Sequence, residues 1–393
     1  MSDHTPAISI LGCRGIPAGH GGFESFAERL SLFLIQSGWR VTVYCQANQQ
    51  SGSTESEWRG VRLVSIGVRQ TGALGTIVFD LLSTLHAARE GRPVLTLGYN
   101  TSPLFLVYRL RGITNIVNMD GLEWKRSKWS WWQRAWLRVC ERVALRLANR
   151  CVADHPAIAR HLCKAGVGTE PGAVAESMNR SAKGMAVIPY GCGPAANDRP
   201  EALEELGLQA NDYAIAVARL EPENSMLEIV SGWSLRARGH KLIVVGDIAS
   251  VAPRWADQLR SAASDEVFFA GALYDADRLA TLRRGALVYL HGHRVGGTNP
   301  SLLEAMAAGN AVVAHDNDFN RQVAADGALY FNDTAGCDRA VTALLADGET
   351  RVAMGQANSR AAHSRFSDQA CFEAWRELLL QAQAADPANK RPA

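Results

Sequence analysis

The sequence is poor in three features, and each shortage excludes a class of protein. Its eight cysteines are scattered and form no C-x-x-C pair, which argues against a zinc site or a disulfide framework and favours a reduced, cytoplasmic chain. A net charge of +2 over 393 residues excludes a general nucleic-acid binder, which would be far more basic over a domain. No apolar run is as long as a membrane span, and the short, polar start does not resemble a cleavable signal. Any membrane contact is therefore expected to be peripheral.

What the chain does contain is a repeated α/β rhythm that predicts two domains. Its length exceeds one ordinary core. Short apolar runs alternate with amphipathic segments in both halves, which predicts a parallel sheet in each. The pattern is interrupted near Tyr190, so we expect a Rossmann-like N-terminal domain at residues 1–190 and a second Rossmann-like domain at 191–365. A C-terminal helix, packing back on the N-terminal domain, and a tail are expected at 366–393, and a ligand cleft between the domains.

The strongest candidate site lies in residues 291–314, where a glycine-rich turn stands between an apolar strand and a helix. Residues 296–299 can form a tight turn, and Pro300 suits the first position of a helix over 301–308. The N-terminus of such a helix has unpaired N–H groups and positive partial charge, which predicts a phosphate site. Glu304 can reach the same place, where a carboxylate would accept from a ribose hydroxyl. The stretch therefore predicts a nucleotide site.

A second glycine-rich loop follows the first apolar run of the chain, residues 7–11. It holds five glycines, which are Gly12, Gly15, Gly19, Gly21 and Gly22. An ordinary turn between a strand and a helix needs one or two, so we interpret the loop as one whose backbone approaches a ligand closely. It is longer than the dinucleotide motif G-x-G-x-x-G and lacks the lysine of the P-loop, so neither motif is matched.

Polar side chains follow several expected strands, at the edge where open α/β sheets bind ligands. They are Tyr99 and Asn100, then Asp120, Gly121 and Glu123, then Asp154 and His155. Asp154, which precedes Pro156, could instead be the cap of a helix and have no role in binding a ligand. Arg219 directly follows a strand and is a candidate for binding a diphosphate, because a guanidinium pairs with two phosphate oxygens.

A basic amphipathic helix is expected between residues 131 and 150. Its arginines are spaced four apart, and an apolar stripe begins with Trp132 and Trp136. Two interpretations remain open. The helix has a solvated basic face packed on its domain, or it lies against anionic lipid headgroups with nearby tryptophans at the interface, namely Trp124, Trp129, Trp131 and Trp132.

With these residues in hand, the chain resembles the retaining GT-B glycosyltransferases of family four over nearly its whole length. The segment VGGTNPSLLEAMAAG is similar to that family's donor loop and helix. RGIPAGHGGFESF and DGLEWKRSKWS resemble a narrower branch of bacterial polysaccharide enzymes that includes rhamnosyltransferases. The resemblance implies an α/β protein of the GT-B fold that transfers a sugar, rhamnose from dTDP-rhamnose before a UDP-hexose. Its acceptor would be polyprenyl-diphosphate-linked, at the inner face of the cell membrane, or a polysaccharide, in exopolysaccharide synthesis. The N-terminal domain would lie on the acceptor side, and the C-terminal domain would bind the nucleotide-sugar.

The resemblance also implies roles for single residues. Glu304 matches the second, ribose-binding glutamate of an E-x7-E motif, whose first glutamate falls at Gly296. Arg219 matches the diphosphate arginine, but the lysine usual five residues on is Asn224; His293 or Arg294 could supply the missing cation. Three residues form the implied catalytic set: Asp120, Arg219 and Glu304. The implied donor site comprises Gly21, Gly22, Arg219, Asn224, Gly297, Thr298, Asn299 and Glu304, and the acceptor or membrane side comprises Glu123, Trp124, Arg126 and Trp129.

No metal or other cofactor is expected, because the implied front-face substitution needs neither metal nor protein nucleophile. The acidic pairs Asp275 with Asp277 and Asp316 with Asp318 are interpreted as helix caps. Two alternatives are a non-hydrolysing sugar-nucleotide epimerase and a catalytically silent binding partner, the latter favoured by the departures at Gly296 and Asn224. An NAD-dependent oxidoreductase fits worse, since no acidic residue ends the second strand.

Overall fold

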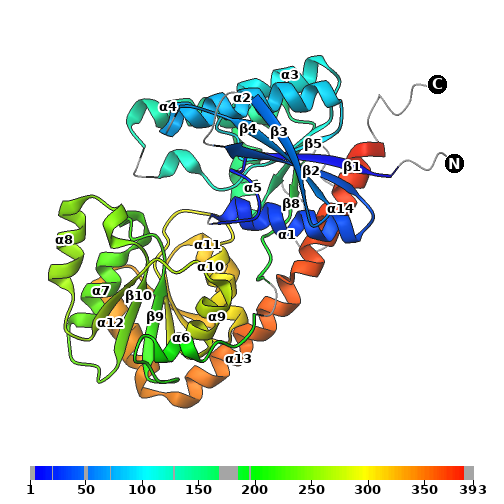
Figure 1. Ribbon diagram of the computed structural model, residues 1–393. Coiled ribbons are helices and arrows are strands. Elements are labelled where there is room, and N and C mark those ends of the chain that lie inside the picture. The colour runs from blue at the N-terminus through cyan, green and yellow to red at the C-terminus, as the bar shows by residue number, and fades with distance from the viewer. Residues whose placement is uncertain are drawn as a thin grey trace. The chain divides into compact units, whose positions relative to one another are not determined.

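A computed structural model of the chain describes residues 5–19, 21–47, 52–70, 72–126, 129–167, 185–193 and 196–384. These residues divide into two compact units. The first comprises Met1–Lys125, Trp129–Pro189 and Cys371–Ala393, and the second comprises Arg126–Lys128 and Tyr190–Ala370. Most of the expected C-terminal tail lies outside the described residues. Each unit is a sheet covered by helices, so the expected α/β class is confirmed (Figure 1).

The first unit is built on eight strands in the order β3-β4-β2-β1-β5-β6-β7-β8. They are β1 (Ala7–Leu11), β2 (Arg40–Ala47), β3 (Gly52–Trp58), β4 (Val61–Gly67), β5 (Val94–Leu97), β6 (Asn115–Asn118), β7 (Arg150–Ala153) and β8 (Met185–Val187). All neighbours run parallel except β3 and β4. The sequence did not predict β3, because this edge strand is polar and exposed along nearly its whole length and carries no buried alternation.

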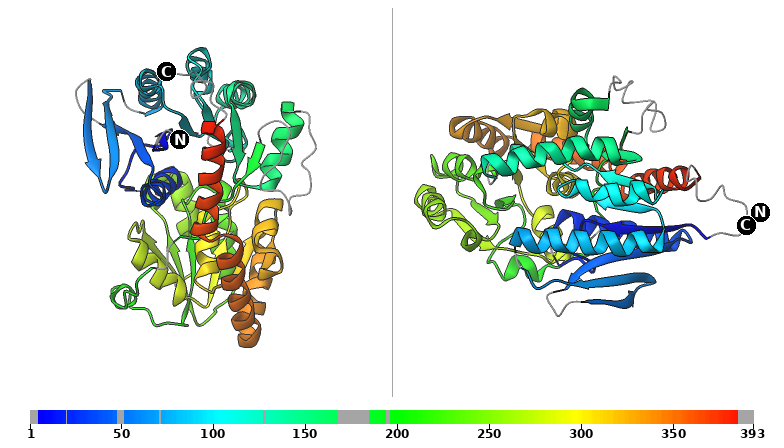
Figure 2. Two further views of the ribbon diagram at one scale, coloured as in Figure 1. Left: turned by 90° about the vertical axis from the view of Figure 1, so that its right-hand side faces the viewer. Right: turned by 90° about the horizontal axis from the view of Figure 1, so that it is seen from above.

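Helices cover both faces of this sheet. They are α1 (Gly22–Gln36), α2 (Gly72–Glu90), α3 (Phe105–Leu110), α4 (Trp131–Leu147), α5 (Pro156–Leu162) and α14 (Asp368–Ala384). The helices α2, α3 and α4 lie side by side on one face, and α1 and α14 lie on the other (Figure 2). The contact between α1 and α14 is aromatic, with ring centroids of Phe26 and Trp375 5.5 Å apart. The C-terminal helix thus packs on the N-terminal sheet.

The second unit has six strands, all parallel, in the order β11-β10-β9-β12-β13-β14. They are β9 (Tyr213–Val217), β10 (Lys241–Val245), β11 (Val267–Gly271), β12 (Val288–His291), β13 (Ala311–His315) and β14 (Ala328–Phe331). The helices are α6 (Glu201–Glu204), α7 (Met226–Ser234), α8 (Pro253–Ala262), α9 (Ala276–Arg284), α10 (Pro300–Ala307), α11 (Asp318–Ala324), α12 (Thr334–Ala346) and α13 (Gly348–Arg365). Within the described ranges, no helix of either unit has the length and apolar character needed to cross a bilayer.

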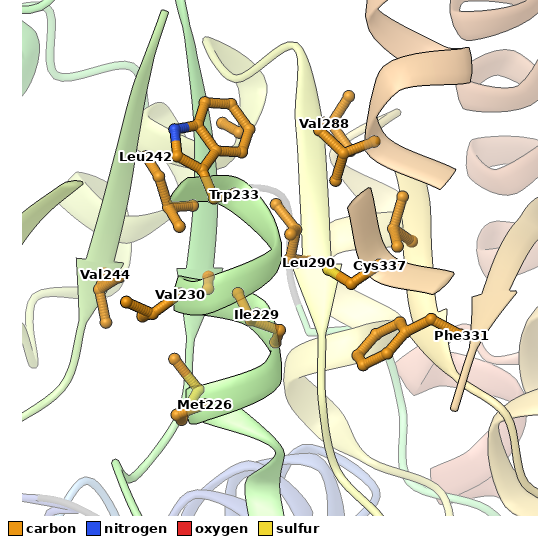
Figure 3. Packing of buried hydrophobic residues seen from close by; sticks show 14 of the residues in the cluster. Met226, Ile229, Val230, Trp233, Leu242, Val244, Val288, Leu290, Phe331 and Cys337 are labelled. Atoms are coloured by element: carbon orange, nitrogen blue, oxygen red, sulfur yellow. The ribbon is translucent and has the colours of Figure 1, made fainter. Parts of the chain in front are cut away.

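The core of the second unit fills both faces of its sheet. One cluster packs α7, α8 and α12 on the strands, with Trp233 fully buried between Leu242 and the neighbouring side chains (Figure 3). A smaller cluster on the other face includes Tyr213, Leu282 and Ala305. Each fully buried leucine, isoleucine or methionine contributes roughly 1.5–3 kcal/mol. The two clusters therefore hold the strand ends in fixed positions, which is what a binding site at the sheet edge requires.

Candidate donor and acceptor sites

Each sheet has one point where the chain reverses its direction of winding. In the second unit, β9 pairs with β10 on one side and with β12 on the other. The connections leaving the carboxyl ends of β9 and β12 turn to opposite faces, and open α/β sheets bind ligands in the crevice that this leaves. Arg219 follows β9 and the glycine-rich segment 292–299 follows β12. The structure therefore brings Arg219 and the glycine-rich segment, both singled out in the sequence, to one edge of one sheet.

The helix α10 begins at Pro300, as the sequence predicted. Asn299 is its N-cap, and the side-chain oxygen of this residue accepts a hydrogen bond of 3.0 Å from the backbone N–H of Ser301. The hydroxyl of Ser301 donates to the carbonyl oxygen of Val217 at 3.0 Å and also contacts the hydroxyl of Tyr289. These bonds tie the N-terminus of α10 to the end of β9, so the positive end of the helix is fixed beside the strand that leads to Arg219.

The turn ahead of α10 leaves room near its glycines. Gly296 has a φ of +156°, and no heavy atom lies within 4 Å of the position that a Cβ would occupy. Gly297 and Asn299 are half-buried, and Thr298 is buried with only 3% of its surface exposed. Gly292 is different, because a Cβ there would lie 2.0 Å from the carbonyl oxygen of Asn224. Only glycine fits where this loop crosses the segment after β9.

Glu304 is paired with an arginine that the sequence analysis did not single out. Nη2 of Arg283, at the end of α9, lies 2.7 Å from Oε2 of Glu304. The arginine side chain is 5% exposed and the carboxylate 39% exposed, so the buried cation orients a carboxylate that still faces solvent. A charged acceptor held in this way suits a ribose hydroxyl. Arg283 lies far from Glu304 in the sequence, and no motif links the two.

Arg219 is exposed, and its guanidinium makes no hydrogen bond or ion pair with the described residues of the second unit. Its backbone is held instead, because the side-chain amide of Asn224 donates to the carbonyl oxygen of Arg219 at 2.7 Å. Asn224 is 2% exposed, and its assignment to the donor site stays a prediction. Through this hydrogen bond, its side-chain amide holds the backbone of Arg219 in place.

Neither His293 nor Arg294 supplies the cation that we expected from them. Burial, and next the positive charge of Arg219, lower the pKa of His293 to about 3, so its imidazole is neutral near pH 7. Its ring stacks on His291 with centroids 4.6 Å apart. Arg294 is committed elsewhere, since its Nε donates to the hydroxyl of Ser225 at 2.7 Å and its Nη2 pairs with Glu228. Among the described residues at this edge, Arg219 is thus the cation best placed for an anion.

The first unit has a cavity of about 220 Å³ at its own reversal point, where β1 pairs with both β2 and β5. The ends of β1 and β5 contribute Gly12 and Gly98, and polar side chains of α2 and the loop after β5 face the same space. A Cβ on Gly12 would lie 2.1 Å from the carbonyl oxygen of Leu97, so the two strand ends approach as only glycine allows. The first glycine-rich loop therefore borders a cavity.

Asp80 is the ionisable group that distinguishes this cavity. Burial raises the pKa of its carboxyl to about 6, and a hydrogen bond of 2.8 Å from the hydroxyl of Thr101 opposes that shift. Sequence reasoning missed both residues. The available signal was a single acidic residue inside the apolar run GTIVFDLLSTL, which is unusual in a helix packed on a core.

Gly21 caps α1 with a φ of +104°, and Gly22 begins that helix. Two carboxylates of α1 accept hydrogen bonds from backbone N–H groups of the loop before it. Glu24 accepts from the N–H of Arg14 at 2.9 Å, and Glu28 accepts from that of Ala18 at 2.5 Å. The N–H groups available to a ligand in this loop are thus fewer than its glycine count indicated.

The segment after β6 holds the remaining predicted residues. Asp120 is half-buried, and its backbone N–H donates to the side chain of Asn118 at 3.2 Å. The hydroxyl of Tyr99 accepts from the backbone N–H of Glu123 at 3.2 Å. The indole N–H of Trp129 donates to the Glu123 carboxylate at 3.3 Å. These bonds join the ends of β5 and β6 into one polar edge.

Trp124 and Arg126, which we assigned to the acceptor or membrane side, both have partners within the protein. The indole N–H of Trp124 donates to the buried carboxylate of Glu141 at 2.9 Å, and its ring lies under the guanidinium of Arg138. Trp124 is half-buried between these partners, and its expected place at a lipid interface stays a prediction. Arg126 belongs to the second unit, where Nη1 is 3.8 Å from a carboxylate oxygen of Glu223.

Helix caps and acidic pairs also differ in part from expectation. His155, not Asp154, caps α5, with Nδ1 accepting from the N–H of Ala157 at 3.1 Å. Asp275 caps α9 as expected. Asp316 instead pairs with Arg321. No group of three or more histidine, cysteine or acidic side chains within the described ranges is arranged to hold a metal ion.

Two family models match the chain, one for each half. Residues 5–175 match a family described as a domain of unknown function, DUF1972. Residues 198–361 match the family described as glycosyl transferases group 1. The match to glycosyl transferases group 1 thus lies within the second unit. The matched region includes β9 with Arg219, the glycine-rich turn, α10 and the Arg283–Glu304 pair.

Solved glycosyltransferase structures have the same fold. Sucrose-phosphate synthase from Thermosynechococcus elongatus is 17% identical, with a TM-score of 0.76 over 97% of this chain and 100% of that one. The UDP-forming trehalose-phosphate synthase from Burkholderia xenovorans, solved with glucose-6-phosphate, is 14% identical with a TM-score of 0.72, covering 96% and 100%. Anabaena HepE, solved with UDP and glucose, is 16% identical with a TM-score of 0.68 and the same coverage. No curated protein matches the chain in sequence. The GT-B fold is thereby confirmed.

Proposed function

We propose that the chain is a retaining glycosyltransferase of bacterial surface polysaccharide synthesis. It moves a sugar, rhamnose from dTDP-rhamnose in our proposal, to a polyprenyl-diphosphate-linked or polysaccharide acceptor. One observation carries the proposal: three features meet at one sheet edge of the region that matches glycosyl transferases group 1. They are Arg219, whose guanidinium has no partner among the described residues of its unit, an anchored helix N-terminus and an oriented carboxylate. The arginine and the helix N-terminus suit a diphosphate, and the carboxylate suits a ribose hydroxyl.

The donor would bind with its diphosphate at Arg219 and the start of α10, and with a ribose hydroxyl donating to Glu304. HepE, which shares the fold, was solved with UDP and glucose, and this supports a nucleotide-sugar as the donor class. Positive charge at the diphosphate stabilises the negative charge that develops there as the sugar leaves. Binding and catalysis would then use the same groups.

The proposed reaction is a front-face substitution. The acceptor hydroxyl oxygen forms a bond to the anomeric carbon on the face from which the diphosphate leaves, and the bond between that carbon and the diphosphate oxygen breaks. The hydroxyl proton passes to the departing diphosphate oxygen. The chain supplies no nucleophile and requires no metal in this scheme; it orients both substrates and stabilises charge. Asp120, at the polar edge after β6, is proposed to lie beside the reacting carbon.

The cavity of the first unit is the proposed place for the acceptor sugar. Its volume of about 220 Å³ is lined by aromatic rings and by hydroxyl, amide and carboxyl groups, which is the chemistry that holds sugar rings and their hydroxyls. Phe23 packs near Gly98, within 3.5 Å of where a Cβ would stand, and borders this space. The departures at Gly296 and Asn224 do not remove the groups that this scheme uses.

A donor screen tests the proposal. Purified protein is heated with dTDP, UDP, GDP and their sugars, and stabilised mixtures are then assayed for nucleotide release with and without bacterial lipid extract. The proposal expects stabilisation by one nucleotide family and release that depends on the extract. Conversion of the sugar nucleotide without any acceptor would instead identify an epimerase, and absence of nucleotide binding would identify a catalytically silent partner.

A further inference from the structure

Three neighbouring helices of the first unit carry an unusual share of exposed apolar side chains. Of the fifteen exposed large hydrophobic side chains among the described residues, ten lie on α2, α3 and α4. On α2 and α3 they are Leu74, Ile77, Leu81, Leu82, Leu106 and Leu110, and on α4 they are Trp131, Trp132, Trp136 and Val139. We call these ten residues the apolar surface. The helices that bear them lie side by side on one face of the sheet (Figure 2).

The spacing on α2 shows that this exposure is organised. Leu74, Ile77 and Leu81 stand three and four residues apart and so share one stripe of the helix, whereas Phe79 and Ala87 face the core and are buried. Leu74 is 60% exposed and Leu110 on α3 is 77% exposed. A helix that is apolar outward as well as inward is atypical of a water-facing surface, and an apolar patch extending over three helices marks a contact surface.

Charge around the apolar surface is of one sign. The exposed ionisable residues of the three helices are all arginines: Arg89, Arg109, Arg138, Arg142 and Arg146. The carboxylates on the same helices turn inward and are paired. Glu141 binds Trp124 and His161, Glu90 pairs with Arg62, and Asp80 accepts from Thr101. An incoming partner would therefore meet apolar side chains and guanidinium groups, with no exposed carboxylate from these helices.

We propose that the apolar surface docks on an anionic phospholipid bilayer. Leucines and tryptophans would enter the boundary between headgroups and acyl chains, while the arginines contact headgroup phosphates. A second copy of the chain fits this surface less well, because a symmetric interface would set arginines against arginines. The proposal rests on the proposed function only for its purpose, which is to bring the enzyme to an acceptor carried by the membrane. It places α2 and α3 in the contact and leaves out Trp124.

Vesicle flotation tests the apolar part of the contact. Wild type, Leu74→Glu and Leu110→Glu are mixed with phosphatidylglycerol vesicles or phosphatidylcholine vesicles. Both leucines are exposed, so the variants should fold, and circular dichroism checks this. Val352→Glu, on α13 and also 60% exposed, is the matched control. Each surface variant should lose about tenfold or more in affinity for the anionic vesicles, because buried methylene groups are lost and a like charge is added, and the control should lose none.

A second pair of variants tests the charge. Arg142→Ala should weaken binding to phosphatidylglycerol vesicles about fivefold, the typical effect of one arginine near an anionic surface. Arg254→Ala, an exposed arginine of α8, should leave it unchanged. Equal binding to both kinds of vesicle, or equal binding by all variants, would overturn the proposal. A dimer that Leu74→Glu dissociates would overturn it too, in favour of a second copy.

Nucleotide binding separates this proposal from the proposed function. A wild-type protein that binds its nucleotide but floats with no vesicle would refute the docking surface and leave the glycosyltransferase proposal standing. A protein that floats with anionic vesicles but binds no nucleotide would do the reverse. Leu74→Glu and Leu110→Glu, which lie in the first unit and outside the proposed donor site, should bind nucleotide like the wild type.

Discussion

Arg283 holds Glu304 by an ion pair of 2.7 Å, and the two ends of that pair lie in different surroundings. The guanidinium is buried at the end of α9, while the carboxylate on α10 remains partly exposed beside the glycine-rich turn. Removing either partner therefore has two consequences, one for the folded state and one for the ligand. Substitutions at Glu304 and at Arg283 separate the two consequences.

Glu304→Gln keeps the shape of the side chain but removes its charge. A hydrogen bond to a charged group contributes about 1.5–3 kcal/mol, so nucleotide affinity should fall roughly ten- to a hundredfold. Isothermal titration calorimetry with the nucleotide chosen by the donor screen measures this. Glu349→Gln, at an exposed carboxylate of α13, is the control and should bind like the wild type. An unchanged affinity in Glu304→Gln would remove this residue from the donor site.

Arg283→Met and Glu304→Ala should affect stability differently. Methionine fills the buried space and leaves a carboxylate that solvent can reach, so the loss should be small, whereas alanine at position 304 leaves a buried guanidinium unpaired at a cost of up to about 3 kcal/mol. Urea unfolding of both variants tests the order. Equal losses would show that the ion pair does not stabilise the second unit. Arg283→Met should still weaken nucleotide binding, because the carboxylate is no longer oriented.

His293 makes the stability of the second unit depend on pH. Burial first, and then the charge of Arg219, place its folded pKa near 3, below its unfolded value near 6.5. Between these values the unfolded chain binds a proton that the folded chain does not, so stability falls as pH falls from about 6.5 toward 3. In His293→Gln that slope should be shallower by at most about 1.4 kcal/mol per pH unit. His363→Gln, on α13, is the control; an imidazole of His293 that titrates near 6.5 by NMR would contradict the assignment.

Asp80 gives the stability of the first unit a pH dependence of the opposite sign. Its folded pKa of about 6 lies above the ordinary value of 3.8 for an aspartate in the unfolded chain. The folded chain therefore keeps a proton that the unfolded chain loses, and stability falls as pH rises through this range. Asp80→Asn removes that loss while keeping an acceptor for Thr101. The variant should be more stable than the wild type above pH 6, by up to about 3 kcal/mol, and no more stable below pH 4. Urea unfolding at the two pH values measures the difference; a pH-independent difference would mean that packing, not the proton, is responsible.

Much of the donor site could be predicted from the sequence because its signals are local. A strand, a glycine-rich turn and a proline-started helix lie within one short stretch, and Arg219 directly follows a strand. The groups that hold these residues could not be predicted. Arg283 and Glu304 meet only when α9 and α10 pack together. Asn224 is buried where the loop after β12, distant in the sequence, crosses its segment at Gly292.

In the first unit, too, some features could not be predicted from the sequence. Helix α2 was not predicted, because an apolar outward stripe conceals the periodicity that marks a helix on the surface. Trp124 was assigned to a lipid interface on composition alone, and the structure shows that Glu141 binds its indole N–H. A pattern of residue types identifies what can bind lipid; the fold decides which of those side chains are exposed.

Binding of a diphosphate at Arg219 is the central feature of the proposed donor site. Calorimetry should compare a nucleoside diphosphate with its monophosphate, for the base chosen by the donor screen, in the wild type, Arg219→Ala and the control Arg254→Ala. Charge-assisted hydrogen bonds to the second phosphate should make the wild type prefer the diphosphate by about tenfold or more, and Arg254→Ala should retain that preference. In Arg219→Ala the preference should disappear. If Arg219→Ala prefers the diphosphate as strongly as the wild type, the proposed donor site is wrong.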